Sequence, residues 1–170
     1  VISSNLPLIS IYDADTLQLV RDLPQIHTSR LPFVCFDTTG SHLVSTSNDR
    51  TAALWDWPTG AYVRSFKGHT EPVRCACFAP LTHELITAGD DGEIRLWDVS
   101  TGVPSGVPMG GSRYPVYAIA VHPRGRILAS GQTDGAVTFW DLAARRQLAT
   151  FRNHTDQIFT LDFSSDGRYL

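Results

Sequence analysis

Residues 85–98, LITAGDDGEIRLWD, hold two short apolar runs on either side of a turn made of aspartates and glycine. Apolar and β-branched runs that flank an Asp-Gly turn are typical of a β-hairpin. The same stretch gathers four carboxylates within nine positions, namely Asp90, Asp91, Glu93 and Asp98. Such a cluster is compatible with a metal site, with a catalytic carboxylate pair, or with a purely structural role.

The hairpin pattern recurs along the chain at a fixed period. Residues 44–56, 86–98 and 129–141 align with one another without a gap. Two series of landmarks share this period: the aromatic-Asp pairs that begin at Tyr12, Trp55, Trp97 and Trp140, spaced 43, 42 and 43 residues, and the positions His27, His69, Ser112 and His154, spaced 42, 43 and 42. Self-similarity at about 42 residues predicts a repeat architecture.

Each unit is predicted to contain four strands. Apolar runs precede the hairpins at 33–36, 73–78, 116–121 and 158–163, and further runs follow two of them at 62–66 and 147–151. Short strands that are separated by turn residues at regular intervals predict an all-β fold.

The repeats resemble the WD-repeat family, because Gly68-His69 opens one unit and Trp-Asp closes three of them. The resemblance implies a β-propeller built from four-stranded blades. The three complete blades then span 27–68, 69–110 and 111–152, with the last two strands of a preceding blade in 1–26 and the start of a further blade in 153–170. Because an open arc leaves sheet edges unpaired, we expect a segment of a seven-bladed ring that a longer chain or another chain completes.

Composition excludes several classes of function. With 42% hydrophobic and 18% charged residues the chain is globular, and a net charge of -3 with scattered basic residues does not favour nucleic-acid binding. Neither a long apolar run nor a signal peptide is present, so a soluble protein of the cytoplasm or nucleus is predicted, without a membrane partner. One subgroup of WD propellers binds phosphoinositides through Phe-Arg-Arg-Gly, but the nearest match, AARRQL, lacks both flanking residues, so Arg145 and Arg146 are predicted to form a solvated turn.

The three cysteines are Cys35, Cys75 and Cys77. An odd count does not suggest a disulfide framework and favours a reducing compartment. The Cys75-x-Cys77 pair offers two ligands for a thiophilic metal, which is too few, so small buried core residues are the better interpretation. No cofactor is predicted.

One unit contains His69, Thr87 and Asp91, which are the residue types of a hydrolase triad. The set recurs in the preceding unit with the same separations, however, and a catalytic centre needs only one copy. The resemblance to the family assigns these positions to structural hydrogen-bonded tetrads, which are His27, Ser45, Asp49 and Trp55; His69, Thr87, Asp91 and Trp97; and an incomplete set of Ser130, Asp134 and Trp140, with Ser112 in place of histidine.

The family resemblance also assigns partner contacts to the narrow top face of the propeller. The positions that correspond to it here are Arg30, Asn48, Arg74, Asp90, Tyr117, Thr133, Gln157 and Phe159, together with Pro32, Pro72 and Pro115. Aromatic and arginine side chains are common interface anchors, so Arg74, Tyr117 and Phe159 beside Asp90 predict a binding arc. Alternatively, the aromatics only cover the rim of the central channel.

The sequence therefore predicts a non-enzymatic scaffold that binds peptides or partner subunits within a larger assembly. Two alternatives remain: a recognition module of an enzyme complex, such as a ubiquitin ligase or a chromatin assembly, or a propeller attached to a catalytic domain outside these residues.

Overall fold

The computed structural model describes residues 8–170, and within that range the secondary structure consists of strands without helices. β1 (Ser10–Tyr12) pairs with β2 (Leu19–Asp22) in a two-stranded sheet. The first complete blade is β3 (Phe33–Phe36), β4 (His42–Thr46), β5 (Thr51–Asp56) and β6 (Tyr62–Lys67). The second is β7 (Val73–Phe78), β8 (Leu85–Gly89), β9 (Glu93–Trp97) and β10 (Met109–Gly110). The third is β11 (Val116–Val121), β12 (Ile127–Gln132), β13 (Val137–Asp141) and β14 (Arg146–Phe151).

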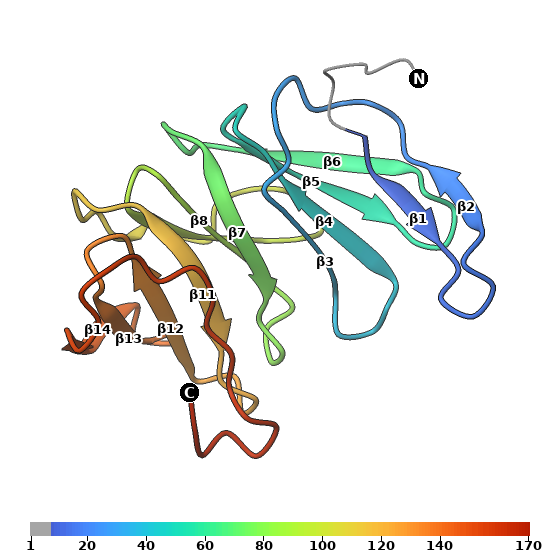
Figure 1. The fold of residues 1–170 in the computed structure, drawn as a ribbon. Helices are drawn as coiled ribbons and strands as arrows, with labels where there is room; N and C mark the ends of the chain where they lie inside the picture. Colours follow the sequence, from blue (N-terminus) through green and yellow to red (C-terminus); the bar gives the residue numbers. More distant parts are fainter. Residues whose placement is uncertain (1–7) are drawn as a thin grey trace.

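The sheets lie side by side in the order of the sequence, and β3, β7 and β11 are neighbouring inner strands (Figure 1). Within each sheet, strands that are consecutive in sequence pair antiparallel. This is the blade architecture that the 42-residue period predicts, and it arises because each hairpin is joined to the next by a short turn.

The hairpin of residues 85–98 becomes β8 and β9, in which Leu85 lies opposite Trp97 and Ala88 opposite Ile94. Its turn closes with the Gly92 amide donating to the Gly89 carbonyl at 3.1 Å, and Gly92 adopts a φ of +71°. Only glycine adopts this conformation without a steric penalty. The predicted hairpin, and the turn role of its glycine, are therefore confirmed.

The hydrophobic core lies between successive sheets. Val44, Leu54 and Phe66 of the first blade pack against Leu85 and Trp97 of the second in one buried cluster. A second cluster joins the second blade to the third, and it includes Ile86, Ile94, Val116, Leu128 and Trp140. Each sheet thus buries its apolar side chains against its neighbour, as stacked repeats require.

β10 has only two residues, in a segment rich in proline and glycine, and one predicted strand does not form. The prediction of a strand at 158–163 is wrong, since no strand follows β14 within the described residues. A strand is defined by a ladder of hydrogen bonds to a partner strand, and residues 158–163 form no such ladder. A turn follows them, in which the Ser164 amide donates to the Tyr169 carbonyl at 3.0 Å.

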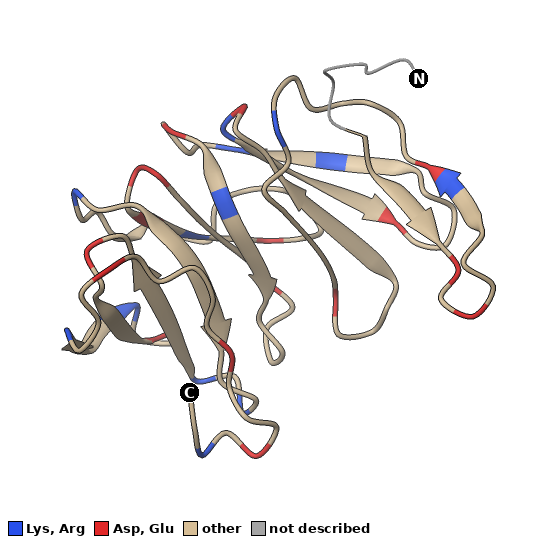
Figure 2. Ribbon diagram, in the orientation of Figure 1, with Lys and Arg blue, Asp and Glu red and all other residues tan. Residues whose placement is uncertain are grey.

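Charged residues are dispersed over the strands and loops of the ribbon in Figure 2 rather than gathered into one basic stripe. The prediction of a solvated turn is wrong for Arg145, which reaches the second blade and pairs with Glu84 at 3.3 Å between Nη2 and Oε1. Arg146 is exposed. No segment of residues 8–170 forms a helix that is long and apolar enough to cross a membrane.

Candidate functional site

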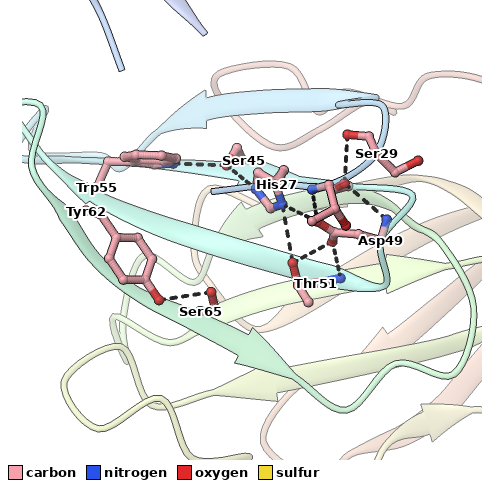
Figure 3. Close-up of polar contacts among 10 residues, drawn as sticks. His27, Ser29, Ser45, Asp49, Thr51, Trp55, Tyr62 and Ser65 are labelled. Atoms are coloured by element: carbon pink, nitrogen blue, oxygen red, sulfur yellow. Dashed lines mark hydrogen bonds and ion pairs between the residues drawn. The ribbon is translucent and has the colours of Figure 1, made fainter. Parts of the chain in front are cut away.

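In the first blade, four side chains form one continuous chain of hydrogen bonds (Figure 3). The Trp55 indole N–H donates to Ser45 Oγ at 2.9 Å, and the two nitrogens of the His27 ring lie 2.9 Å from Ser45 Oγ and from Asp49 Oδ2. An indole N–H only donates and a carboxylate only accepts, so the donated hydrogens run from Trp55 towards Asp49. Thr51 joins the network because its hydroxyl donates to Asp49 Oδ1 at 2.6 Å.

The second blade repeats this arrangement with a threonine in place of the serine. Trp97 donates to Thr87 Oγ1 at 2.8 Å, and the His69 ring lies 2.8 Å from both Thr87 Oγ1 and Asp91 Oδ2. The Asp91 carboxylate also accepts hydrogen bonds from the backbone amides of Thr70 and Glu93. The network therefore fastens the segment before β7 to both strands of the central hairpin.

The third blade retains only part of the network. Trp140 still donates to Ser130 Oγ at 2.8 Å, but Ser112 stands at the histidine position and bonds neither Ser130 nor Asp134 within the described residues. Asp134 instead accepts hydrogen bonds from Arg152 and from the backbone amide of Ala136. The third network is thus broken between its hydroxyl and its carboxylate.

Burial favours a structural role for the two complete networks. Ser45 and Thr87 are both fully buried, at 0% exposure, and each hydroxyl already contacts an indole and an imidazole. A nucleophile must reach a substrate carbonyl, and these oxygen atoms have no access to solvent. The bracing role itself stays a prediction, which stability measurements on variants can test.

Burial alone would raise the pKa of Asp49 and of Asp91, but hydrogen bonds outweigh it. For Asp49, the donors Thr51, the Thr28 amide and His27 hold the carboxyl pKa below its usual value. For Asp91, the donors are His69 and the amides of Glu93 and Thr70, and the pKa is again lowered. Both carboxylates are therefore stabilised in their charged form.

These lowered pKa values predict acid lability. A carboxyl whose pKa is depressed in the folded state contributes stability above its unfolded pKa of about 3.9, and this contribution is lost as the pH falls through the folded value. We expect Asp91→Asn to be less stable than the parent at about pH 6 but to lose less stability on acidification to about pH 3. Urea unfolding across this pH range checks the prediction, and parallel curves for parent and variant would contradict it.

A second cluster lies where the hairpin turns and the starts of the inner strands meet. The Arg74 guanidinium donates to both carboxylate oxygens of Asp90, with Nε at 2.7 Å from Oδ1, and its Nη1 lies 3.4 Å from Asn48 Oδ1 of the first blade. The hydrogen bonds that Arg74 donates to Asp90 are the main cause of the raised pKa of Arg74. A bidentate pair of this kind fixes the orientation of the guanidinium.

The cluster continues into the third blade through aromatic contacts. The Arg74 guanidinium carbon lies 5.2 Å from the centroid of the Tyr117 ring, which is within cation–π range. The Tyr117 and Phe159 ring centroids are 5.9 Å apart, and Phe159 is 70% exposed. Asn48, Arg74, Asp90, Tyr117 and Phe159 thus form one contiguous surface, hereafter the aromatic arc.

The remaining predicted contact positions lie outside the aromatic arc. Arg30 and Gln157 are exposed and Thr133 is half-buried, and within the described residues none of their side chains forms a hydrogen bond or an ion pair. Their backbones follow the repeat, since the amides of Asn48, Asp90 and Thr133 donate to the carbonyls of Arg30, Pro72 and Pro115 at 2.9, 2.9 and 3.0 Å. The structure therefore places Arg30 and Thr133 in the regular backbone pattern of the repeat, but it joins none of Arg30, Thr133 and Gln157 to the arc.

The cysteines are free thiols, and Cys75 is buried. Burial raises the pKa of Cys35 to about 12 and raises the pKa values of Cys75 and Cys77 well above their usual value. Such thiols stay protonated and are poor metal ligands. Residues 8–170 contain no cluster of three or more His, Cys, Asp or Glu side chains arranged to hold a metal ion.

A family model for the WD40 repeat, described as the WD domain, G-beta repeat, matches residues 18–56, 60–98, 105–141 and 145–170. These matches cover most of the sequence. The chain belongs to the WD40 repeat family. Each of the first three WD40 matches runs from the outer strand of one sheet through the third strand of the next, so one sequence repeat joins two blades.

Three relatives illustrate the range of WD40 proteins to which the chain is similar. The U3 small nucleolar RNA-associated protein 15 homolog of Xenopus laevis is 33% identical over 145 residues, which cover 85% of this chain and 28% of the relative. The nuclear distribution protein PAC1-2 of Uncinocarpus reesii is 33% identical over 161 residues, covering 89% and 35%. The pre-mRNA-processing factor 19 homolog 2 of Arabidopsis thaliana is 27% identical over 164 residues, covering 94% and 31%. The chain spans about a third of the length of these relatives.

Two contacts of the hydrogen-bonded networks were missed by sequence reasoning. Thr51 extends the first network, and Arg152 takes over the Asp134 carboxylate in the third blade. The absence of histidine at position 112 signalled the second change, because an aspartate at a buried hairpin turn then needs another donor. For Thr51 the signal was weak, since the equivalent positions are Glu93 and Ala136.

Proposed function

We propose that this WD40 chain is a non-catalytic module that binds a peptide or a partner subunit on the aromatic arc, as part of a multiprotein complex in the cytoplasm or nucleus. The observation that carries this proposal is the linkage of Arg74 to Asp90, to Tyr117 and, through Tyr117, to exposed Phe159. Pre-ordered arginine and aromatic side chains lose little entropy on binding, which makes them effective anchors.

The comparisons support the coarser part of the proposal. The names of two relatives place those proteins with a small nucleolar RNA and in pre-mRNA processing, settings in which proteins work in complexes. A recognition module of an enzyme complex, or a propeller attached to a separate catalytic domain, uses the same surface and differs only in what accompanies it. In each case the blades supply binding rather than chemistry.

Affinity purification with quantitative mass spectrometry tests the arc. We expect Arg74→Ala and Tyr117→Ala each to reduce recovery of at least one partner by about tenfold or more, as truncation of an interface anchor does. Leu148→Ala is the matched control, because Leu148 is an exposed apolar residue of β14, at 44% exposure, away from the arc. Recovery of every partner at the level of the parent with both arc variants would refute the proposal.

A further inference from the structure

A polar pocket lies between the end of the second blade and the third blade. Its walls are residues 110–112 on one side and the ends of β12, β13 and β14 on the other, and its volume is about 500 Å³. The lining side chains that matter for binding are Ser112, Gln132, Thr138, Trp140, Thr150 and Arg152. This volume lies within the range of sites that hold small molecules or protruding side chains.

The missing histidine accounts for the opening. The Ser112 carbonyl oxygen lies 1.9 Å from where a Cβ on Gly92 would stand, and the His154 carbonyl oxygen lies 2.3 Å from the equivalent point on Gly135. The backbone at 112 therefore keeps the close approach that the repeat makes at its histidine position, and only the side chain is shorter. Consistently, Trp140 is 7% exposed, whereas Trp55 and Trp97 are 1% and 0% exposed.

Gln132 gives the pocket its chemistry. It stands where the other blades have Ser47 and Gly89, and it is only 7% exposed, yet its side-chain amide forms no hydrogen bond within the described residues although it faces the pocket. The Gln132 amide atoms are not among the fully buried polar atoms that lack a partner, so they keep contact with solvent in the open pocket. The amide therefore offers a donor and an acceptor to whatever enters.

The other polar groups are occupied but accessible. Thr138 and Thr150 bond each other at 2.9 Å between their hydroxyl oxygens, and Arg152, whose side chain is 61% exposed, pairs with Asp134 at the rim. A Cβ at Gly111 would meet no atom within 4 Å, so the entrance beside it is open. The pocket thus combines an indole wall, hydroxyl groups and one unpaired amide, with no unpaired charge.

We propose that this pocket binds the imidazole of a histidine side chain that a partner protein supplies. An imidazole is planar and offers a donor and an acceptor on different edges, which suits the free amide of Gln132 and the indole wall. It is also the group that the two complete blades carry at the sequence position of Ser112, as His27 and His69. The partner histidine would take the place that Ser112 leaves open.

Titration of the ¹⁵N-labelled protein with free imidazole, at about pH 8 where imidazole is mostly uncharged, tests the proposal by NMR. We expect the Trp140 indole and Gln132 side-chain amide signals to shift saturably, with a dissociation constant in the millimolar range. The indole signals of Trp55 and Trp97 should stay in place, which provides a control inside the same molecule. Equal shifts of all three indoles, or no saturable shift, would overturn the proposal.

Two variants and two further probes sharpen the test. Gln132→Leu, which keeps the volume but removes the amide, should weaken imidazole binding about fivefold or more, and Ser112→His should abolish it by filling the pocket. Unchanged imidazole binding by a folded Gln132→Leu variant would overturn the proposal, even if Ser112→His failed to fold. The peptide acetyl-Gly-His-Gly-amide should bind at least as tightly as imidazole, whereas tighter binding of acetamide would overturn the assignment to histidine.

Discussion

Replacement of Gly92 by alanine is expected to destabilise the protein by about 2 to 5 kcal/mol, the sum of a left-handed backbone penalty and an overpacking penalty. Gly92 has a φ of +71°, and a Cβ there would lie 1.9 Å from the Ser112 carbonyl oxygen of the next blade. Because that oxygen belongs to backbone, the side chain cannot be accommodated without moving the two blades apart. Urea unfolding of parent and variant measures the loss.

Gly40→Ala is the matched control for this effect. Gly40 has nearly the same φ, +70°, but a Cβ there would meet no atom within 4 Å. The Gly40→Ala substitution should therefore lower the free energy of unfolding only by the penalty of the left-handed backbone, about 1 to 2 kcal/mol. Equal losses for the two variants would show that the blades do not approach each other at Gly92 as the structure places them.

The second large effect is expected at the complete network of the second blade. Asp91→Ala removes the acceptor for His69 and for the amides of Thr70 and Glu93, so we expect a loss of about 2 to 4 kcal/mol from unsatisfied donors. The variant should keep the strands of the second blade but unfold at lower temperature. Thermal and urea unfolding check this directly.

The third blade offers the control for the Asp91 prediction. Asp134→Ala removes an acceptor from Ala136 and from the largely exposed Arg152, and no imidazole depends on it. Its cost should be about 1 kcal/mol, since an exposed arginine regains water as a partner. A loss as large as that of Asp91→Ala would contradict the idea that the imidazole link gives the network its strength.

Much of the fold could be predicted because its determinants are local and repeated. The strands at 33–36, 73–78 and 116–121 form where their apolar runs indicate, bounded by the turn residues on either side. The failure at 158–163 has a non-local cause, since a strand also needs a partner with which to form a ladder. Sequence pattern reports the tendency of a segment but not the presence of that partner.

The candidate site was predictable in its positions but not in its contacts. The repeat register places Arg74, Tyr117 and Phe159 at equivalent points of successive blades, and the structure brings their side chains together. The register does not reveal that Asn48 also reaches Arg74, nor that the Gln132 amide is left unpaired. Such details depend on rotamers and on the exact spacing between sheets, which no single repeat encodes.

The central claim is that these blades act by binding through the aromatic arc. Its most direct test is partner recovery by the double variant Tyr117→Ala, Phe159→Ala, measured by quantitative mass spectrometry beside Leu148→Ala and at equal amounts of folded protein. We expect the double variant to lose at least one partner by more than about tenfold while the control keeps it. Full recovery of every partner by the double variant would contradict the account.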